Sequence, residues 1–99
     1  MKKIQVLVDQ IDEEIEGAKD YAEIYLDYKA KGNSNWASKY KSMAEDELRH
    51  AMYIHERAVE EITELNKVYT PPVDMQEKWD ASHKRYVERV AWIKQMLAM

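Results

Sequence analysis

Apolar side chains return at alternating steps of three and four residues through almost all of the sequence. This spacing places them on one face of an α-helix, whereas a half-buried β-strand would need alternation at every second residue. The chain holds only two glycines and two prolines, so few points interrupt the pattern. We therefore predict an all-α fold of three helices, which span residues 3–31, 35–68 and 74–97.

Two short segments separate the predicted helices. The first segment is Gly32-Asn33-Ser34. Glycine suits the C-terminus of a helix, and asparagine or serine suits the N-cap of the next one. Thr70-Pro71-Pro72 ends the second helix, because proline has no amide hydrogen and the residue before it avoids helical angles. Asp74, three residues before Glu77, then predicts a capping box at the start of the third helix.

Charge interrupts the apolar face of each of the first two helices. In the first helix this face comprises Leu7, Ile11, Glu14, Ala18, Tyr21 and Tyr25. In the second helix it comprises Trp36, Tyr40, Met43, Glu47, His50 and Ile54. The spacing predicts that both faces are buried. A buried charge is costly unless a partner neutralises it, so these faces call for such a partner.

Glu47 and His50 lie three residues apart, and residues at that separation share one face of a helix. Both side chains can therefore reach a single metal ion. One Glu on a helix and a Glu-x-x-His on the next form half of the ligand set of di-iron carboxylate bundles. Glu14, Glu47 and His50 are therefore the candidate metal ligands. A simpler alternative, an ion pair between Glu47 and a protonated His50, stays open.

The candidate ligands on the two helices are not all at the same distance from the first loop. Glu14 lies about one helical turn further from the loop than Glu47, and His50 is closer to the level of Glu14. Glu13 and Glu16 are candidate outer ligands. Glu16 also belongs to an acidic stripe that we expect to face solvent, together with Asp9, Asp20, Glu23 and Asp27.

A short loop between two long helices predicts an antiparallel hairpin. The second helix has a further stripe, formed by Ala44, Leu48, Ala51, His55, Ala58, Ile62 and Leu65. The third helix has one face, formed by Trp79, His83, Tyr86, Val90, Ile93 and Leu97. This helix is too short to cover both long helices. We predict a single domain of 99 residues that forms a two-fold homodimer or a larger even-numbered homo-oligomer.

Composition excludes several other classes of site. Without cysteine the chain forms no disulfide, thiolate zinc site or iron–sulfur cluster. The net charge of -4 gives no reason to expect nucleic-acid binding. No apolar run approaches the roughly 20 residues of a membrane helix. No signal peptide is recognisable, so we expect a cytoplasmic protein. Carboxylates and imidazoles suit iron, manganese and zinc.

Other notable residues on these helices are expected to be structural. Tyr21 and Tyr25 are interpreted as aromatic core, with a redox tyrosine as the alternative. His55 and His83 have no carboxylate at ligand spacing on the same face, which indicates interior or interface histidines. Gly17 costs about 1 kcal/mol within a helix relative to alanine, and we expect it to permit close helix approach beside the candidate ligands.

Two segments of the chain resemble a known family. Residues 13–21, with the sequence EEIEGAKDY, and residues 44–51, with the sequence AEDELRHA, resemble the ferritin-like superfamily. The rubrerythrin-like branch is nearest, and especially the half-ferritins that include the encapsulated ferritins. The resemblance covers roughly residues 8–60, which lie within the first two predicted helices and the loop between them.

The resemblance implies a fold and a chemistry. In half-ferritins one helical hairpin carries the Glu and the Glu-x-x-His, and a dimer completes the four-helix bundle with its di-iron ferroxidase centre. By position Glu14, Glu47 and His50 would be the iron ligands, and Glu13 and Glu16 resemble metal-entry positions. The helical pattern continues to residue 97, so we expect no flexible tail of the kind that encapsulated ferritins carry. The chain also lacks the cysteine-rich iron domain of rubrerythrins, so electron delivery would need another protein.

We therefore expect a ferritin-like di-iron carboxylate protein that binds Fe(II) between two subunits and oxidises it with oxygen or peroxide. Glu47 would bridge the two ions, while Glu14 and His50 would be terminal ligands. Manganese and zinc are alternative metals, and no catalytic residue is assigned beyond the ligands. Two other functions stay open: a non-catalytic helical interaction module that keeps the bundle without metal, and a peroxide reductase supplied with electrons by a partner.

Overall fold

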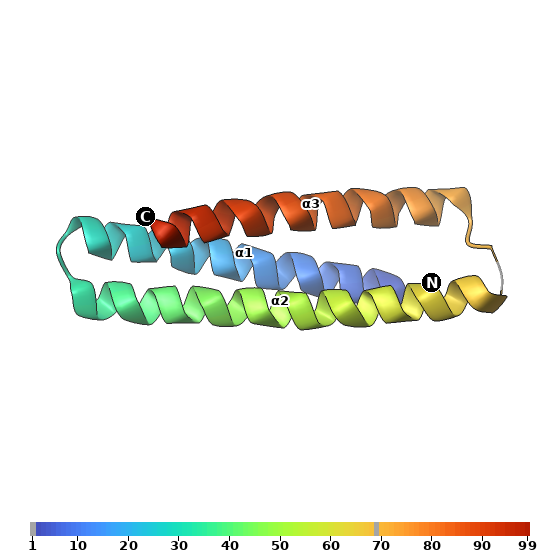
Figure 1. The fold of residues 1–99 in the computed structure, drawn as a ribbon, viewed down its shortest axis with the longest axis horizontal. Coiled ribbons are helices and arrows are strands. Elements are labelled where there is room, and N and C mark those ends of the chain that lie inside the picture. The colour runs from blue at the N-terminus through green and yellow to red at the C-terminus, as the bar shows by residue number, and fades with distance from the viewer. Residues whose placement is uncertain (1, 69) are drawn as a thin grey trace.

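The computed structural model describes residues 2–68 and 70–99, and within them it is entirely helical apart from the loops. The three helices are α1 (Lys2–Ala30), α2 (Ser34–Val68) and α3 (Val73–Ala98). Each bound lies within one residue of the prediction. The helices run along the long axis of a rod that measures 55 × 17 × 17 Å (Figure 1). None of the described helices has a stretch long and apolar enough to cross a membrane.

The loop between α1 and α2 has the chemistry that the sequence predicts. Gly32 adopts a φ of 74°, a left-handed conformation in which glycine carries no steric penalty. Its N–H donates to the carbonyl of Lys29 at 3.0 Å, which satisfies one of the last acceptors of α1. The side chain of Asn33 then accepts a hydrogen bond from the N–H of Trp36 at 3.2 Å. Asn33 therefore caps α2 and sets the point where the chain reverses.

The start of α3 differs from the prediction. The N-cap position is held by Pro72, whose φ of -56° and ψ of 147° are extended, and no side chain caps the helix. The predicted capping box at Asp74 is therefore wrong. Proline fits at this position because its fixed φ suits the approach to a helix and an N-cap needs no amide donor. Asp74 lies instead in the first turn, where a carboxylate is favourable to the helix dipole.

The α1–α2 hairpin packs through small side chains. Along α2 a stripe of alanines recurs every seven residues and is buried: Ala37, Ala44, Ala51 and Ala58. On α1 the buried residues are Ile4, Ile11, Ile15, Ala18, Ala22 and Tyr25. Alanine fills little space, so the backbones of the two helices can lie close together. The second predicted stripe of α2 thus supplies most of its core.

The first predicted face of α2 lies beside this core rather than in it. Trp36 is 45% exposed and Met43 is 38% exposed, so the prediction that this face is buried is wrong for the single chain. The reason is that the alanine stripe, and not the larger side chains, points directly at α1. The open surface that holds Trp36, Met43, Glu47 and His50 is called the open flank of the hairpin below.

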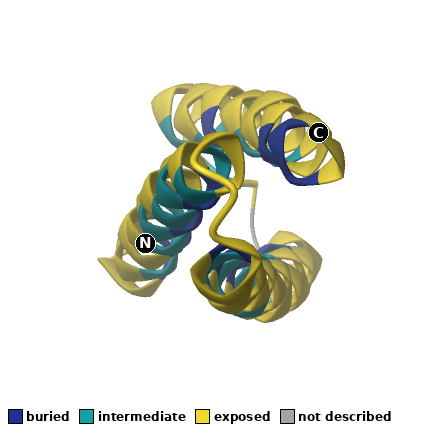
Figure 2. Cartoon of the chain, turned by 90° about the vertical axis from the view of Figure 1, so that its left-hand side faces the viewer, coloured by how far each residue is buried: buried dark blue, intermediate teal, exposed yellow. Residues whose placement is uncertain are grey.

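Helix α3 packs mainly on α1 and has few contacts with α2. Its buried residues include Ile93, Met96 and Leu97, and Arg85 contacts Asp12 of α1 at 3.3 Å. Viewed along the rod, the helices occupy the corners of a triangle, and the outward faces are largely exposed (Figure 2). The third helix therefore covers one side of the hairpin and leaves the open flank uncovered.

Candidate metal centre

The structure brings the three predicted ligands together. Glu14 comes from α1, and Glu47 and His50 come from α2. One ligand atom from each lies within 4.8 Å of the others. The Nδ1 of His50 is 3.5 Å from Oε2 of Glu14 and 4.0 Å from Oε1 of Glu47. Over residues 2–68 and 70–99, no other set of three or more His, Asp or Glu side chains converges in this way.

The distances agree with the levels of the residues along the hairpin. Counting from the loop predicts that His50, rather than Glu47, is level with Glu14. The His50–Glu14 contact is indeed shorter than the His50–Glu47 contact. Glu47 starts nearly one turn nearer the loop, and its flexible side chain spans the difference.

Gly17 makes room for the Glu47 carboxylate. A Cβ atom built on Gly17 would lie 3.2 Å from Oε2 of Glu47 and 3.6 Å from its Cδ. This is tighter than ordinary van der Waals contact, so any larger residue would displace the carboxylate. The predicted role of Gly17, close helix approach beside the ligands, is refined accordingly. The space serves one ligand side chain, which gives a reason for a glycine in mid-helix despite its cost of about 1 kcal/mol.

The two carboxylates influence each other. A hydrogen bond shared with Glu14 raises the pKa of Glu47 to about 6, with partial burial and the charge of Glu14 acting in the same direction. The nearby His50 opposes this rise. Two carboxylates side by side are costly when both are ionised, so one tends to keep a proton. A bound cation would supply the missing positive charge and favour the ionised form of both.

The donor atoms fit a metal ion of ordinary size. Carboxylate oxygens and imidazole nitrogens bind zinc at about 2.0–2.2 Å, so two donors on one ion can be at most about 4.4 Å apart. The three donors of this group lie within 4.8 Å. A movement of a few tenths of an ångström in flexible side chains would place all three around one ion. The set is of oxygen and nitrogen atoms, which suits iron, manganese or zinc.

The group is accessible from the open flank. The side chain of His50 is 51% exposed, and those of Glu14 and Glu47 are 29% and 26% exposed. Three protein ligands leave at least one coordination position of a metal unfilled. Water, a substrate or a residue of another chain could therefore reach the same ion.

The predicted outer ligands do not join this group. Glu13 and Glu16 are exposed, and neither belongs to the cluster formed by the three ligands. Glu16 lies 4.0 Å from Lys19 on the same helix, as expected for a residue of a solvated stripe. The reason is geometric: residues one before and two after Glu14 point away from α2 around the helix.

An aromatic cluster lies on the loop side of the candidate ligands. Tyr21 and Tyr40 have ring centroids 5.9 Å apart, and Tyr28 stacks on Tyr40 at 5.7 Å. Trp36 lies 6.2 Å from Tyr40. Tyr25 is buried in the core, as predicted, whereas Tyr21 is half-buried within this cluster. The sequence pattern located Tyr21 and Tyr40 but missed Tyr28, which stacks on Tyr40 and lies seven residues beyond Tyr21 on the same helix.

His55 and His83 form a second cluster of titratable groups. The Nε2 atom of His55 is 2.9 Å from the Nδ1 atom of His83. The ring of His55 stacks on that of Tyr86, with a centroid distance of 4.2 Å and an interplanar angle of 7°. Burial lowers the pKa of His55, helped by His83 and opposed by Glu56. The two histidines were expected to be structural, but their pairing was not foreseen. Counting from the second loop places His55 nearly one helical turn further away than His83, so the count alone does not predict their pairing.

Comparisons with protein-family models, with curated proteins and with solved structures found no match for this chain. The resemblance to ferritin-like proteins thus rests on the motif residues themselves and stays a prediction.

Proposed function

We propose that this protein binds Fe(II) through Glu14, Glu47 and His50 and oxidises it at a ferritin-like di-iron centre shared by two copies of the chain. One observation carries this proposal: three metal-ligand atoms from two helices lie within 4.8 Å of one another on an accessible surface. The space beside Gly17 adds support, because a Cβ atom there would lie 3.2 Å from the Glu47 carboxylate and would shift it slightly.

The incomplete ligand set favours a shared site. Three ligands per chain cannot fill the coordination sphere of iron, and a two-fold dimer would double them to four carboxylates and two imidazoles. The open flank is suited to such a contact, because Trp36 and Met43 are exposed on it beside the ligands. Aromatic residues and methionine are enriched in protein interfaces. Packing the two open flanks together would bring the two ligand sets face to face.

Within this centre the residues would have distinct roles. Glu47, whose carboxylate lies between Gly17 and the other two ligands, would bridge the two ions. Glu14 and His50 would be terminal ligands. Bound iron would supply the redox chemistry by passing electrons to oxygen or peroxide. Manganese and zinc bind the same donor types, and we expect them to compete for the site.

The test is the iron content per chain after anaerobic Fe(II) addition and desalting, with the solution mass recorded on the same sample. We expect about one iron per chain in an even-numbered assembly, and Fe(II) oxidation on exposure to oxygen. Glu47→Gln should abolish both. Glu88→Gln, an exposed residue of α3 outside the ligand group, is the charge-matched control and should change neither. A stable assembly without bound iron would overturn the proposal.

A second candidate function is a helical interaction module without metal. The specific observation in its favour is that His50 lies within 4.0 Å of both carboxylates, so a protonated imidazole would balance one of the two negative charges. Thermal unfolding separates the two candidates. A metal site predicts a higher melting temperature with Fe(II), Mn(II) or Zn(II), whereas an interaction module predicts no change.

A further inference from the structure

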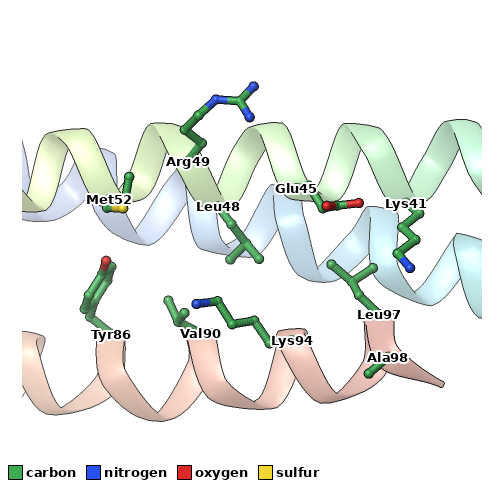
Figure 3. Close-up of a pocket in the computed structure, with 10 residues that line it drawn as sticks. All are labelled: Lys41, Glu45, Leu48, Arg49, Met52, Tyr86, Val90, Lys94, Leu97 and Ala98. Carbon is green, nitrogen blue, oxygen red and sulfur yellow. The ribbon is translucent and has the colours of Figure 1, made fainter.

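A groove separates α2 from α3 on the side of the molecule away from the candidate metal ligands. Figure 3 shows the side chains that line this groove. Its volume is about 500 Å³. The lining residues span positions 41–52 of α2 and 86–98 of α3. At 1.5 Å per residue the groove is therefore about 17 Å long, which equals roughly three turns of an α-helix. It exists because α3 packs on α1 and has few contacts with α2.

The floor and walls of the groove are mainly apolar. They are formed by Leu48, Met52, Tyr86, Val90, Leu97 and Ala98. Apolar side chains come from both helices, so an occupant could contact both walls at once. A three-turn groove between two helices has the shape that accepts the apolar face of another helix.

The polar residues of the groove have an unusual charge balance. Three of them are basic, Lys41, Arg49 and Lys94, while Glu45 is the only acidic one. The chain as a whole has a net charge of -4, so this local excess of positive charge runs against the overall composition. A groove of this kind is complementary to an acidic partner.

Two of these cations form no ion pair with a described carboxylate, although the ammonium group of Lys41 lies 5.9 Å from the ring centroid of Tyr25 on α1. Arg49 already contacts Asp46 on its own helix. By contrast, among residues 2–68 and 70–99 no carboxylate lies within 4.0 Å of the ammonium group of Lys41 or Lys94. The Lys94 side chain extends between the two walls, beside Val90, while Lys41 lies at the end near the first loop (Figure 3).

The arrangement of charges favours a helix over a single-headed amphiphile. Apolar residues lie on both sides of the Lys94 ammonium group, and the second cation is at one end (Figure 3). A fatty acid has one carboxylate and would engage one of the two cations. An amphipathic helix presents apolar residues at steps of three and four with acidic residues beside them, so it can match both cations and the floor.

We propose that the groove between α2 and α3 binds an amphipathic helix of a partner protein, about three turns long, with an apolar stripe flanked by acidic residues. Leu48, Met52 and Val90 contact its apolar stripe. Lys41 and Lys94 pair with its acidic residues. This interaction does not depend on the proposed metal chemistry, since none of the candidate ligands lines the groove.

The test uses two labelled 16-residue helical peptides that share a leucine stripe at steps of three and four. One has glutamates flanking the stripe, and the other has lysines at the same positions. We expect the glutamate peptide to bind saturably, one per chain, at least tenfold more tightly than the lysine peptide, as measured by fluorescence anisotropy. Val90→Gln should weaken binding of the glutamate peptide at least fivefold.

A charge reversal makes the test specific to the groove. In the double variant Lys41→Glu/Lys94→Glu the preference should reverse, so that the lysine peptide binds more tightly. Gained binding cannot come from a protein that has failed to fold, and circular dichroism verifies the helix content. Lys84→Glu, an exposed residue of α3 outside the groove, is the matched control and should keep the original preference.

Three peptide-binding results would overturn the proposal. They are the absence of saturable binding to either peptide, equal affinity for both, and an unchanged preference in the double variant. Dissociation of a dimer by the double variant would also overturn it, because the groove would then contact a second copy. Glu47→Gln should bind the glutamate peptide normally, so loss of metal binding and loss of peptide binding are separate outcomes.

Discussion

The two clusters of titratable side chains in this molecule differ in how their polar groups are balanced. His55 and His83 share a hydrogen bond at 2.9 Å, and His55 stacks on Tyr86, so this pair is held by contacts within the protein. Glu14 and Glu47 are both acidic, and the pKa of Glu47 is raised to about 6 beside its neighbour. The acidic cluster is thus the one that gains most from an added cation. The proposal of a metal site at the acidic cluster therefore rests on its unbalanced charge as well as on the proximity of its side chains.

The largest expected difference between the clusters is their response to metal. At a metal concentration one hundred times the dissociation constant, binding to the folded state alone adds about 2.7 kcal/mol to stability. We expect a gain of that order for the wild type in urea unfolding with Mn(II), and none for His50→Ala. A His83→Ala variant should keep the full gain. If instead His83→Ala removes it, the metal binds at the histidine pair.

The histidine pair should matter for stability without metal. His55→Ala removes a hydrogen bond, worth about 1 kcal/mol, and an aromatic stack of similar value. We therefore expect a loss of about 2 kcal/mol in the free energy of unfolding with chelator present. His50→Ala, whose side chain is half exposed, is the comparison and should lose much less. Equal losses would mean that the stacked pair adds nothing specific.

The clusters should also respond to pH with opposite signs. The pKa of Glu47 is raised to about 6 when the protein is folded. The protonated carboxyl therefore contributes fully to stability below pH 4.5, and this contribution is lost as the pH rises through about 6. The whole shift corresponds to at most about 2 kcal/mol. The pKa of His55 is lowered, so its contribution is full above pH 6.5 and is lost as the pH falls.

Urea unfolding of the metal-free protein between pH 4.5 and 7.5 measures both contributions. Relative to the wild type, Glu47→Gln should be more stable near pH 7, because it removes a carboxylate that is costly when ionised. The advantage should shrink toward pH 4.5. A constant difference across this range would show that Glu47 titrates as an ordinary exposed residue.

The smallest expected effect separates stability from metal binding at a single position. Gly17→Ala should raise helix stability by up to about 1 kcal/mol, because alanine is the better helix former. The added methyl group lies 3.2 Å from the Glu47 carboxylate, so metal affinity should fall at the same time. Ser38→Ala, at an exposed helical position, is the control. Gly32→Ala is unsuitable because Gly32 has a positive φ. A rise in both stability and affinity would contradict the role assigned to Gly17.

The sequence was sufficient to predict the helices and the three side chains that cluster between α1 and α2. Regular spacing, two loop signals and a Glu-x-x-His motif are local features, and each depends on residues close together in the chain. The motif alone could not distinguish a ligand pair from an ion pair, but Glu14 on the neighbouring helix led to the group that the structure brings together. Its use as a metal site stays a prediction.

Features that depend on contacts between helices were harder to predict. The pattern gave two stripes on α2, and only the packing distance decides that alanines rather than Trp36 and Met43 face α1. The histidine pair joins two helices without any local motif. The groove between α2 and α3 arises because α3 packs mainly on α1, a choice that no single helix encodes.

The seven-residue repeat of the alanine stripe divides the hairpin into equivalent layers. Seven residues from Glu14 and Glu47 toward the loop lie Tyr21 and Tyr40, whose rings contact each other. Seven residues in the other direction lie Leu7 and Ile54, which pack against the core. The acidic layer is therefore enclosed along the rod by an aromatic layer and an aliphatic layer. Within the described residues the three side chains are exposed at the open flank, so covering that flank would also control the entry and exit of an ion.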